Sequence, residues 1–231
     1  MPKDEFLDEK IIEMINEVEK PTEQSSGAAA SEESKTEIKP QDRTIYTGIK
    51  IAGKTIEFEE RSFLEEGKIK MMVPKEFTEL DAEIAKFKYP SEHRPDIILT
   101  DESGTTNILF NHMDETMDNE DAEMIRDRLI GMVRRGNPGI RPLSTGIEVI
   151  SGKNVAYVEF SNPVMDGKIY NVMFFLQVAD RILMGSFNCL TKVQKYWKDP
   201  AFQMMCSLQV LDQEDIAEEE VGAEENEIRE E

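Results

Sequence analysis

Residues 166–189 read DGKIYNVMFFLQVADRILMGSFNC, and this stretch decides the fold class. It holds two apolar runs, 168–178 and 181–189, separated by the dipeptide Ala179-Asp180. Two runs joined by so short a break predict a pair of antiparallel strands. In the first run both alternating sets of side chains are largely apolar, which is typical of a central strand covered on both faces. The two sets are Val172, Phe174, Leu176 and Val178, and Met173, Phe175 and Gln177.

The surrounding sequence predicts more strands and a few helices. Alternating apolar residues and turn residues predict a hairpin over 45–51 and 55–58, a second over 96–100 and 105–113, and strands at 67–74, 147–150, 153–160 and 208–211. Helices are expected at 81–87, 118–135 and 197–207. The expected inward residues are Ile84 and Phe87 in the first helix, and Ile125, Leu129, Met132 and Val133 in the second. Strands joined by tight turns, with helices between groups of them, predict an α+β fold with helices packed on an antiparallel sheet.

Charge divides the 231 residues into three parts. The formal net charge is −21, from 27 Lys+Arg against 48 Asp+Glu. Residues 213–231 hold ten acidic side chains and one basic one, and residues 1–40 hold eleven acidic and five basic. Because phosphate binding needs clustered Lys and Arg, this balance excludes a general nucleic-acid binder. No apolar run reaches the roughly 18 residues of a membrane span, and the N-terminus has no signal pattern, so we expect a cytoplasmic protein.

These differences predict the domain organisation. We expect an amphipathic helix in residues 1–20, a flexible linker over 21–40, an α+β domain over 41–212 and a disordered acidic tail over 213–231.

The N-terminal helix carries one apolar stripe at helical spacing. Its members are Leu7, Ile11, Met14, Ile15 and Val18. A helix of about 16 residues is marginal alone in water, so the stripe needs a surface. It either docks on its own domain or binds a groove on another protein through the tether, and the third alternative is a mostly disordered tail.

Several segments resemble the PsbP-like fold superfamily. They are KIKMMVPKEFTEL (68–80), NVAYVEF (154–160), DGKIYNVMFFLQ (166–177), RILMGSFNC (181–189) and KDPAFQMMCSLQV (198–210). The resemblance covers about residues 67–211 and is closest to cytoplasmic, uncharacterised relatives of the bacterial DcrB-like proteins. It implies no catalytic residues; it implies a non-enzymatic protein that binds another protein. The hairpin at 44–59 and the acidic tails depart from the family pattern.

Residues with catalytic or ligand-binding chemistry are few. The sequence has no phosphate-binding glycine loop and no GxSxG motif, and we expect no cofactor. His112 with Asp114, Glu115 or Asp118 is the candidate metal cluster, although the spacing fits a strand end before a helix cap better. Cys189 and Cys206 have apolar neighbours, which favours buried, inert thiols.

Two sets of residues are candidates for binding. Met204 and Met205 belong to an unusual count of 13 methionines, which suits either core filling or an adaptable surface for apolar partners. Tyr157, Tyr170 and Asn188 are polar groups on apolar strands, and would line a pocket if the protein were a small-molecule sensor or enzyme. The sequence favours a non-catalytic protein-binding module, an adaptor or chaperone for a secreted or membrane-associated client, with a partner that has a basic surface. A structural homo-oligomer is a third alternative.

Overall fold

The computed structural model of the chain describes residues 44–51, 53–64, 69–89, 94–136, 140–164 and 167–211. The predicted N-terminal helix, linker and acidic tail lie outside these residues.

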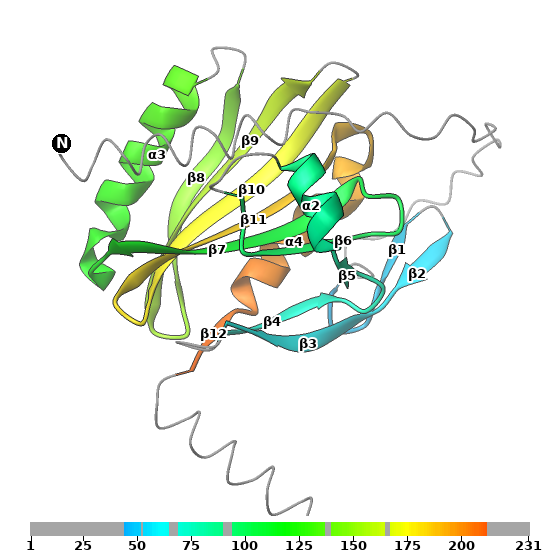
Figure 1. Cartoon of the computed structure of the whole chain (residues 1–231), viewed down its shortest axis with the longest axis horizontal. Helices are drawn as coiled ribbons and strands as arrows, with labels where there is room; N and C mark the ends of the chain where they lie inside the picture. Colours follow the sequence, from blue (N-terminus) through cyan, green and yellow to red (C-terminus); the bar gives the residue numbers. More distant parts are fainter. Residues whose placement is uncertain are drawn as a thin grey trace, which may run out of the picture.

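A seven-stranded antiparallel sheet forms the centre of the molecule (Figure 1). Its order is β5-β6-β7-β11-β10-β9-β8. The strands are β5 (Thr78–Glu79), β6 (Ile97–Thr100), β7 (Thr106–Thr116), β8 (Arg141–Ile150), β9 (Lys153–Val164), β10 (Gly167–Val178) and β11 (Arg181–Leu190). The two strands predicted from residues 168–189 pair in register from Val178–Arg181 to Ile169–Leu190. Ala179 and Asp180 both have positive φ, 49° and 61°, as a two-residue turn that matches the strand twist requires.

The strand β10 is central and apolar on both faces, as its alternation predicts. Val172, Phe174, Leu176 and Val178 belong to a large apolar cluster on one face. Met173 and Phe175 belong to a separate cluster on the other. Through the strand pairing, this alternation also shows which side chains of the neighbouring strands lie on each face of the sheet, because successive side chains of a strand point to opposite faces.

The large cluster lies between the sheet and a layer of smaller elements. These are β1 (Ile49–Ile51), β2 (Lys54–Ile56), β3 (Phe58–Phe63), β4 (Ile69–Pro74), α4 (Gln194–Cys206), which follows a 3-10 turn (Thr191–Val193), and β12 (Gln209–Val210). Strands β12, β4 and β3 form a three-stranded sheet, and β1 and β2 form a separate hairpin. The sequence predicted the hairpin and β4 but not β3, which pairs with β4 from Phe58–Pro74 to Phe63–Ile69.

The other face of the large sheet carries α2 (Ala82–Lys88) and α3 (Ala122–Gly136). Helix α3 follows a 3-10 turn (Asn119–Asp121), which Asp118 and Asp121 cap by a reciprocal capping box. Ile125 and Leu129 of α3 pack on β9 and β10 through Val158 and Phe175, as the predicted stripe requires. None of the helices in the described ranges is long and apolar enough to cross a lipid bilayer.

The predicted orientation of the first helix is wrong at Ile84, which is 53% exposed. The buried residues of this segment are Ala85 and Tyr89, which pack on Ile98 and Leu109. The Asp81 side chain caps α2 by accepting from the main-chain N–H of Glu83. The buried side of the helix is therefore the one that carries Ala85, and Ile84 lies outside it.

Candidate functional site

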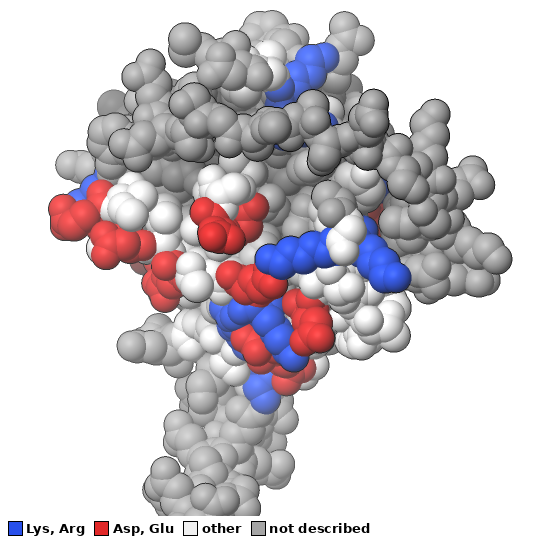
Figure 2. Space-filling model, turned by 90° about the vertical axis from the view of Figure 1, so that its right-hand side faces the viewer, with Lys and Arg blue, Asp and Glu red and all other residues white. Residues whose placement is uncertain are grey.

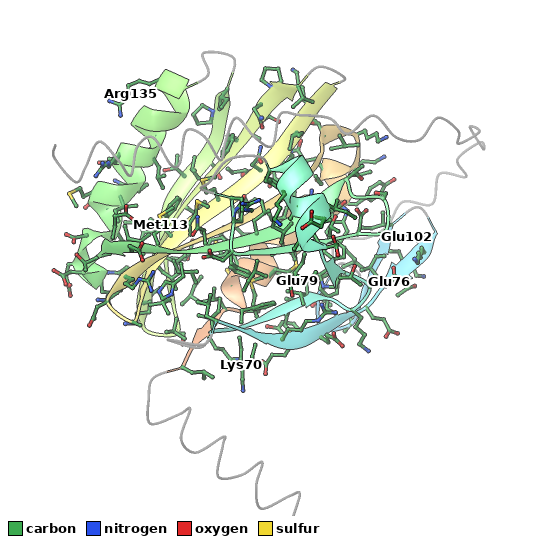
Figure 3. All side chains as sticks on the ribbon, in the orientation of Figure 1. Lys70, Glu76, Glu79, Glu102, Met113 and Arg135 are labelled. Atoms are coloured by element: carbon green, nitrogen blue, oxygen red, sulfur yellow. The ribbon has the colours of Figure 1, made fainter. Side chains whose placement is uncertain are left out.

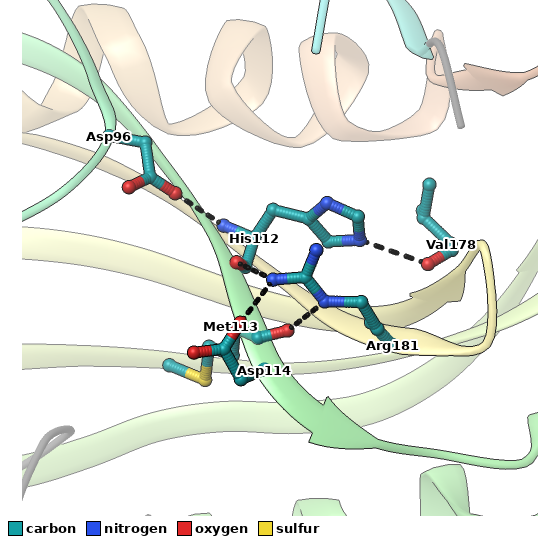
Figure 4. A network of polar contacts seen from close by, with 6 residues as sticks. All are labelled: Asp96, His112, Met113, Asp114, Val178 and Arg181. Atoms are coloured by element: carbon teal, nitrogen blue, oxygen red, sulfur yellow. Dashed lines mark hydrogen bonds and ion pairs between the residues drawn. The ribbon is translucent and has the colours of Figure 1, made fainter. Parts of the chain in front are cut away.

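Two residues of the candidate metal cluster, His112 and Asp114, belong to the strand network drawn in Figure 4. The Nε2 atom of His112 lies 3.0 Å from the Val178 carbonyl oxygen, and the His112 main-chain N–H donates to the Asp96 carboxylate at 2.8 Å. His112 therefore links β7 to the end of β10. Within the described ranges, no group of three or more His, Cys, Asp and Glu side chains could hold a metal.

Arg181 completes this network from the start of β11. Its guanidinium donates to the carbonyl oxygens of His112 and Met113 at 2.9 and 2.8 Å, and pairs with Asp114 at 2.8 Å. The Asp114 carboxylate is thus engaged by Arg181, and Asp118 caps the turn before α3. The contacts support a structural role, in which they hold β7 against the β10–β11 turn.

A second polar network surrounds Glu159 on the α4 face of the sheet. The carboxylate is only 7% exposed, and accepts from Lys198 Nζ at 2.6 Å and from Ser144 Oγ at 2.8 Å. Burial by itself raises the pKa of the Glu159 carboxyl, but the hydrogen bonds from Lys198, Ser144 and Tyr170 outweigh burial and leave that pKa below its ordinary value. Burial, together with the Glu159 charge, raises the pKa of the Tyr170 hydroxyl.

Glu159 and Tyr170 each keep one charge state near neutral pH. The Glu159 carboxylate stays ionised and Tyr170 stays protonated, so neither is poised to exchange a proton there. The network therefore stabilises the contact between α4 and β9, and we see no group in it that is prepared for acid–base catalysis.

The two cysteines differ in their exposure to solvent. Cys189 is buried in the large apolar cluster, and burial raises the pKa of its thiol to about 12. Cys206 is exposed, which differs from the expectation, and partial burial of its thiol with the nearby Glu148 charge raises its pKa. Both thiols are held in the unreactive protonated form.

Met204 and Met205 lie inside the protein. Each is 1% exposed and belongs to the large apolar cluster under α4. Core filling therefore accounts for both side chains, and neither offers a surface to a partner in this conformation. The other predicted partner-binding residues, Leu7, Ile11, Met14, Ile15 and Val18, lie outside the described residues.

The three residues proposed for a ligand pocket do not come together. Tyr157 and Tyr170 face α4. Asn188 faces the opposite side, because it has the parity of Ile182 and Met184 in the α3 cluster. A sheet separates the tyrosines from Asn188, so no single pocket is lined by all three.

Sequence reasoning missed the significance of one row of side chains. Thr100, Asn107 and Asn188 face one another across β6, β7 and β11, and Asn188 is opposite Asn171 of β10. All are buried on the face that carries α2 and α3. The signal was available in the sequence as asparagine at matching parity in three predicted strands, but only the register places the residues in one row.

The edge strand β8 also differs from its neighbours. It ends the strand order, so β9 is its one hydrogen-bonded neighbour among the strands of the described part. Val149 is 74% exposed and Leu143 is 49% exposed. Natural edge strands are usually protected by Pro, Lys or a bulge. Here Pro142 and a bulge protect only the start of β8, and residues 144–150 carry a single charge, Glu148.

The other edges are better protected. At the far end of the large sheet β5 has only two residues, and in the small sheet β3 carries three consecutive charged residues, Glu59, Glu60 and Arg61. Arg61 also donates to the carbonyl oxygens of Phe77 and Lys75. Among the described strands, β8 thus offers the longest weakly protected edge.

Charges on the described surface are mixed. Figure 2 shows acidic and basic side chains next to one another on the side that carries β1 and β2. Lys54 pairs with Glu76 at 2.7 Å and Lys75 with Glu57 at 3.0 Å. Glu76 and Glu102 lie at this same end, and Arg135 on α3 lies at the opposite side of the view (Figure 3).

Comparison with known proteins supports the fold class. No protein-family model matches the sequence. No curated protein matches it either. Cyanobacterial PsbP (CyanoP) from Synechocystis sp. PCC 6803 is similar in structure, with a TM-score of 0.50 and 13% identity over 67% of this chain and 92% of that one. LpqN, involved in cell envelope biogenesis of Mycobacterium tuberculosis, has a TM-score of 0.45 and 12% identity over 67% of this chain and 92% of that one.

The architecture is thus α+β, an antiparallel sheet with helices on its faces. The likeness to CyanoP supports the more specific prediction of a PsbP-like fold for the domain. At 13% identity it concerns the fold alone.

Proposed function

We propose that this chain is a non-catalytic, cytoplasmic protein-binding module that takes an extended segment of its partner onto the edge of β8. The observation that carries the proposal is the long, weakly protected edge with Val149 and Leu143 exposed beside it. An added strand satisfies the free main-chain groups of such an edge, and pockets or apolar side chains along it provide selectivity.

The polar networks support a binding role over a catalytic one. His112 and Arg181 are engaged in contacts that hold strands together, and Glu159 is engaged by Lys198 and Ser144. A catalytic acid or base needs a pKa near the working pH and access to substrate. The Glu159 carboxyl, with its lowered pKa and its buried position, meets neither condition.

The chemistry of the partner follows from charge. The chain has a net charge of −21, and the β8 edge contributes Glu148 and no lysine over residues 144–150. A partner segment that alternates apolar and basic residues would pack on Val149 and be attracted by the acidic chain. Because the Debye length is about 8 Å at physiological ionic strength, higher salt weakens the long-range part of this attraction.

The N-terminal stripe supplies a second proposed contact. Its residues are Leu7, Ile11, Met14, Ile15 and Val18. A helix tethered by a linker raises the local concentration of a second binding element at the partner without enlarging the β8 contact. Such a two-point arrangement suits an adaptor or chaperone for a secreted or membrane-associated client.

The test compares the full chain with Val149→Lys and with a control, Tyr46→Lys. Lysine on an edge strand blocks strand addition and repels a basic partner. Tyr46 is 71% exposed in the turn before β1, so its change adds the same charge away from β8. Proteins captured from the native cell by each variant are identified, and each captured partner is then purified and titrated against all three chains at low and high salt.

The expected result is one partner that binds the wild type and Tyr46→Lys alike, and binds Val149→Lys at least tenfold more weakly. Equal binding by all three chains would overturn the assignment of the edge. A double variant, Ile11→Glu with Ile15→Glu, tests the proposed N-terminal contact. Unchanged binding of the partner by this variant would overturn that contact.

A further inference from the structure

The two faces of β8 carry different chemistry. Gly146 is opposite Tyr157 of β9, which packs against the large apolar cluster, so Gly146 and Glu148 point to the side of the sheet that carries α4. Ile147 and Val149 point to the opposite side, where Ile147 packs against the cluster under α3. A segment added to β8 therefore meets different side chains on its two faces.

The ring of Tyr157 covers the place of a side chain at Gly146. A Cβ atom at position 146 would lie 2.8 Å from the Tyr157 hydroxyl oxygen and 3.0 Å from Cζ. Phe202 of α4 packs on this ring edge to face, with the ring centroids 5.2 Å apart. An aromatic ring that leans over a glycine in this way supplies the packing that the glycine lacks. The Tyr157 hydroxyl is thereby brought to the outermost strand of the sheet.

Glu148 adds a second acceptor on the same face. It is exposed and is the single charged residue of 144–150. Among the described residues Glu148 has no ion-pair partner, whereas Glu159 on this face pairs with Lys198 at 2.6 Å. Burial, and then the Glu148 charge, raise the pKa of the Tyr157 hydroxyl, so the carboxylate and the hydroxyl lie within electrostatic reach of one another.

The α3 side of the β8 edge is apolar in this stretch. Val149 is 74% exposed and Ile147 is half-buried. Apolar and β-branched side chains opposite such residues stabilise strand pairing. A slip of one residue would move the apolar side chains of an added strand to the face that carries Glu148. The two faces together therefore specify the register of the added strand.

We propose that Glu148 and Tyr157 select the partner: the added segment runs antiparallel to β8 and places an arginine opposite Glu148. The guanidinium pairs with the Glu148 carboxylate and donates to the Tyr157 hydroxyl oxygen. The apolar residues on either side of the arginine pack on Ile147 and Val149. This inference rests on the proposed addition of a strand to β8, and it names the residue that the strand must carry.

The distances of strand pairing allow this contact. Residues directly opposite one another are about 4.5–5.5 Å apart and diagonal ones about 7–8 Å, which a long side chain can span. The Tyr157 ring occupies the diagonal place, because it lies over Gly146. Arginine fits better than lysine, since its planar guanidinium presents several donors in a fixed fork and can reach both acceptors.

The same arrangement disfavours a second copy of this chain as the occupant. Residues 144–150 contain no basic side chain to place opposite Glu148, and the chain has a net charge of −21. Pairing of two β8 strands would leave both Glu148 carboxylates without a cation and bring two acidic chains together.

Short peptides with blocked ends test the inference on the full chain. In STVRVTS the register that places the arginine opposite Glu148 also places the valines opposite Ile147 and Val149. STVKVTS and STVQVTS change the central residue alone. Hydrogen exchange of the β8 amides shows whether a peptide adds as a strand, and fluorescence polarisation of labelled peptides gives the affinity. STVRVTS should slow exchange in β8 and bind roughly two- to fivefold more tightly than STVQVTS, with STVKVTS between them.

Variants of the protein assign this preference to its residues. Glu148→Gln should abolish the preference for STVRVTS over STVQVTS, and Glu148→Arg should bind STVEVTS more tightly than STVRVTS. The matched control is Glu102→Gln, which removes the same charge from an exposed residue in the turn between β6 and β7 and should keep the preference. Tyr157→Phe retains the ring without the hydroxyl, and should reduce the preference for arginine over lysine.

The outcomes separate this inference from the proposed function. Slowed exchange in β8 with equal affinities for STVRVTS and STVQVTS would overturn the selection by Glu148 while strand addition stands. An arginine preference that persists in Glu148→Gln would overturn it as well. If none of the peptides slows exchange in β8, strand addition itself is wrong and this inference falls with it. A dimer in analytical ultracentrifugation that Val149→Lys dissociates would assign the edge to a second copy and overturn both.

Discussion

Gly185 of β11 lies directly beneath the ring of Phe174 on the neighbouring strand β10. A Cβ atom at position 185 would lie 2.7 Å from Phe174 Cε1, with two further ring carbons nearer still. The ring is 3% exposed in the large apolar cluster, and protein cores are close-packed, so the ring has little room to move away. We therefore expect Gly185→Ala to destabilise the protein through this contact.

The magnitude follows from two opposing terms. Overpacking a well-packed core costs about 1–3 kcal/mol, and three ring contacts place this site at the upper end. Replacing glycine by alanine by itself raises the free energy of unfolding by about 0.5–1 kcal/mol, because the unfolded chain loses conformational freedom. The net loss in the free energy of unfolding is thus about 2 kcal/mol. For a domain of this size that lowers Tm by about 4–8 °C.

Denaturant unfolding followed by circular dichroism measures this loss, and Gly146→Ala is the matched control. Gly146 lies under Tyr157 in the same way, with a Cβ at 2.8 Å from the Tyr157 hydroxyl oxygen, but that ring is half-buried and can move outward. The control should cost less than half as much. Equal stability of Gly185→Ala and the wild type, or a larger loss in Gly146→Ala, would refute the reasoning.

Three further predictions concern single side chains. Glu159→Gln should lose about 1 kcal/mol at pH 7, a modest value because Lys198 is half-exposed. The pKa of the Glu159 carboxyl is lowered in the folded protein, so its contribution to stability is complete above the ordinary value of 4.5 and disappears as the pH falls through the folded pKa. The difference in free energy of unfolding between wild type and Glu159→Gln should therefore vanish at low pH. A difference that does not change with pH would contradict this. A thiol reagent should label Cys206 slowly and Cys189 only after unfolding, and labelling of both in the native protein would show that Cys189 is accessible. Asp81→Ala removes the cap of α2 and should cost about 1 kcal/mol, measured against Asp81→Asn, which keeps the acceptor.

The edge of β8 and the row of buried asparagines lie at different places on the large sheet and present different hydrogen-bonding groups. The edge offers a row of main-chain groups of one outer strand, whereas the row offers side-chain amides across several strands.

Local patterns in the sequence determined many of the strands, turns and helices of this protein. The alternation in 168–189 predicted the pairing of β10 and β11, because strand parity depends only on neighbours along the chain. Turn residues predicted the hairpin at 97–113 for the same reason. A cap at Asp118 or Asn119 was expected for the following helix, and the structure places it at Asp118, on the 3-10 turn that precedes α3. The burial of Leu129 followed from helical spacing.

The tertiary structure determined which side chains from distant strands share a face of the sheet and lie next to one another. Asn188 looked like a pocket residue beside Tyr170, yet the two point to opposite faces of the sheet. Met204 and Met205 could have formed a surface, and the packing of α4 buried them. The asparagine row and the open edge of β8 arise from strand order, which depends on contacts between residues far apart in sequence. Such contacts leave no periodic signal along the chain, so a single sequence predicts the strands but not which side chains they bring together.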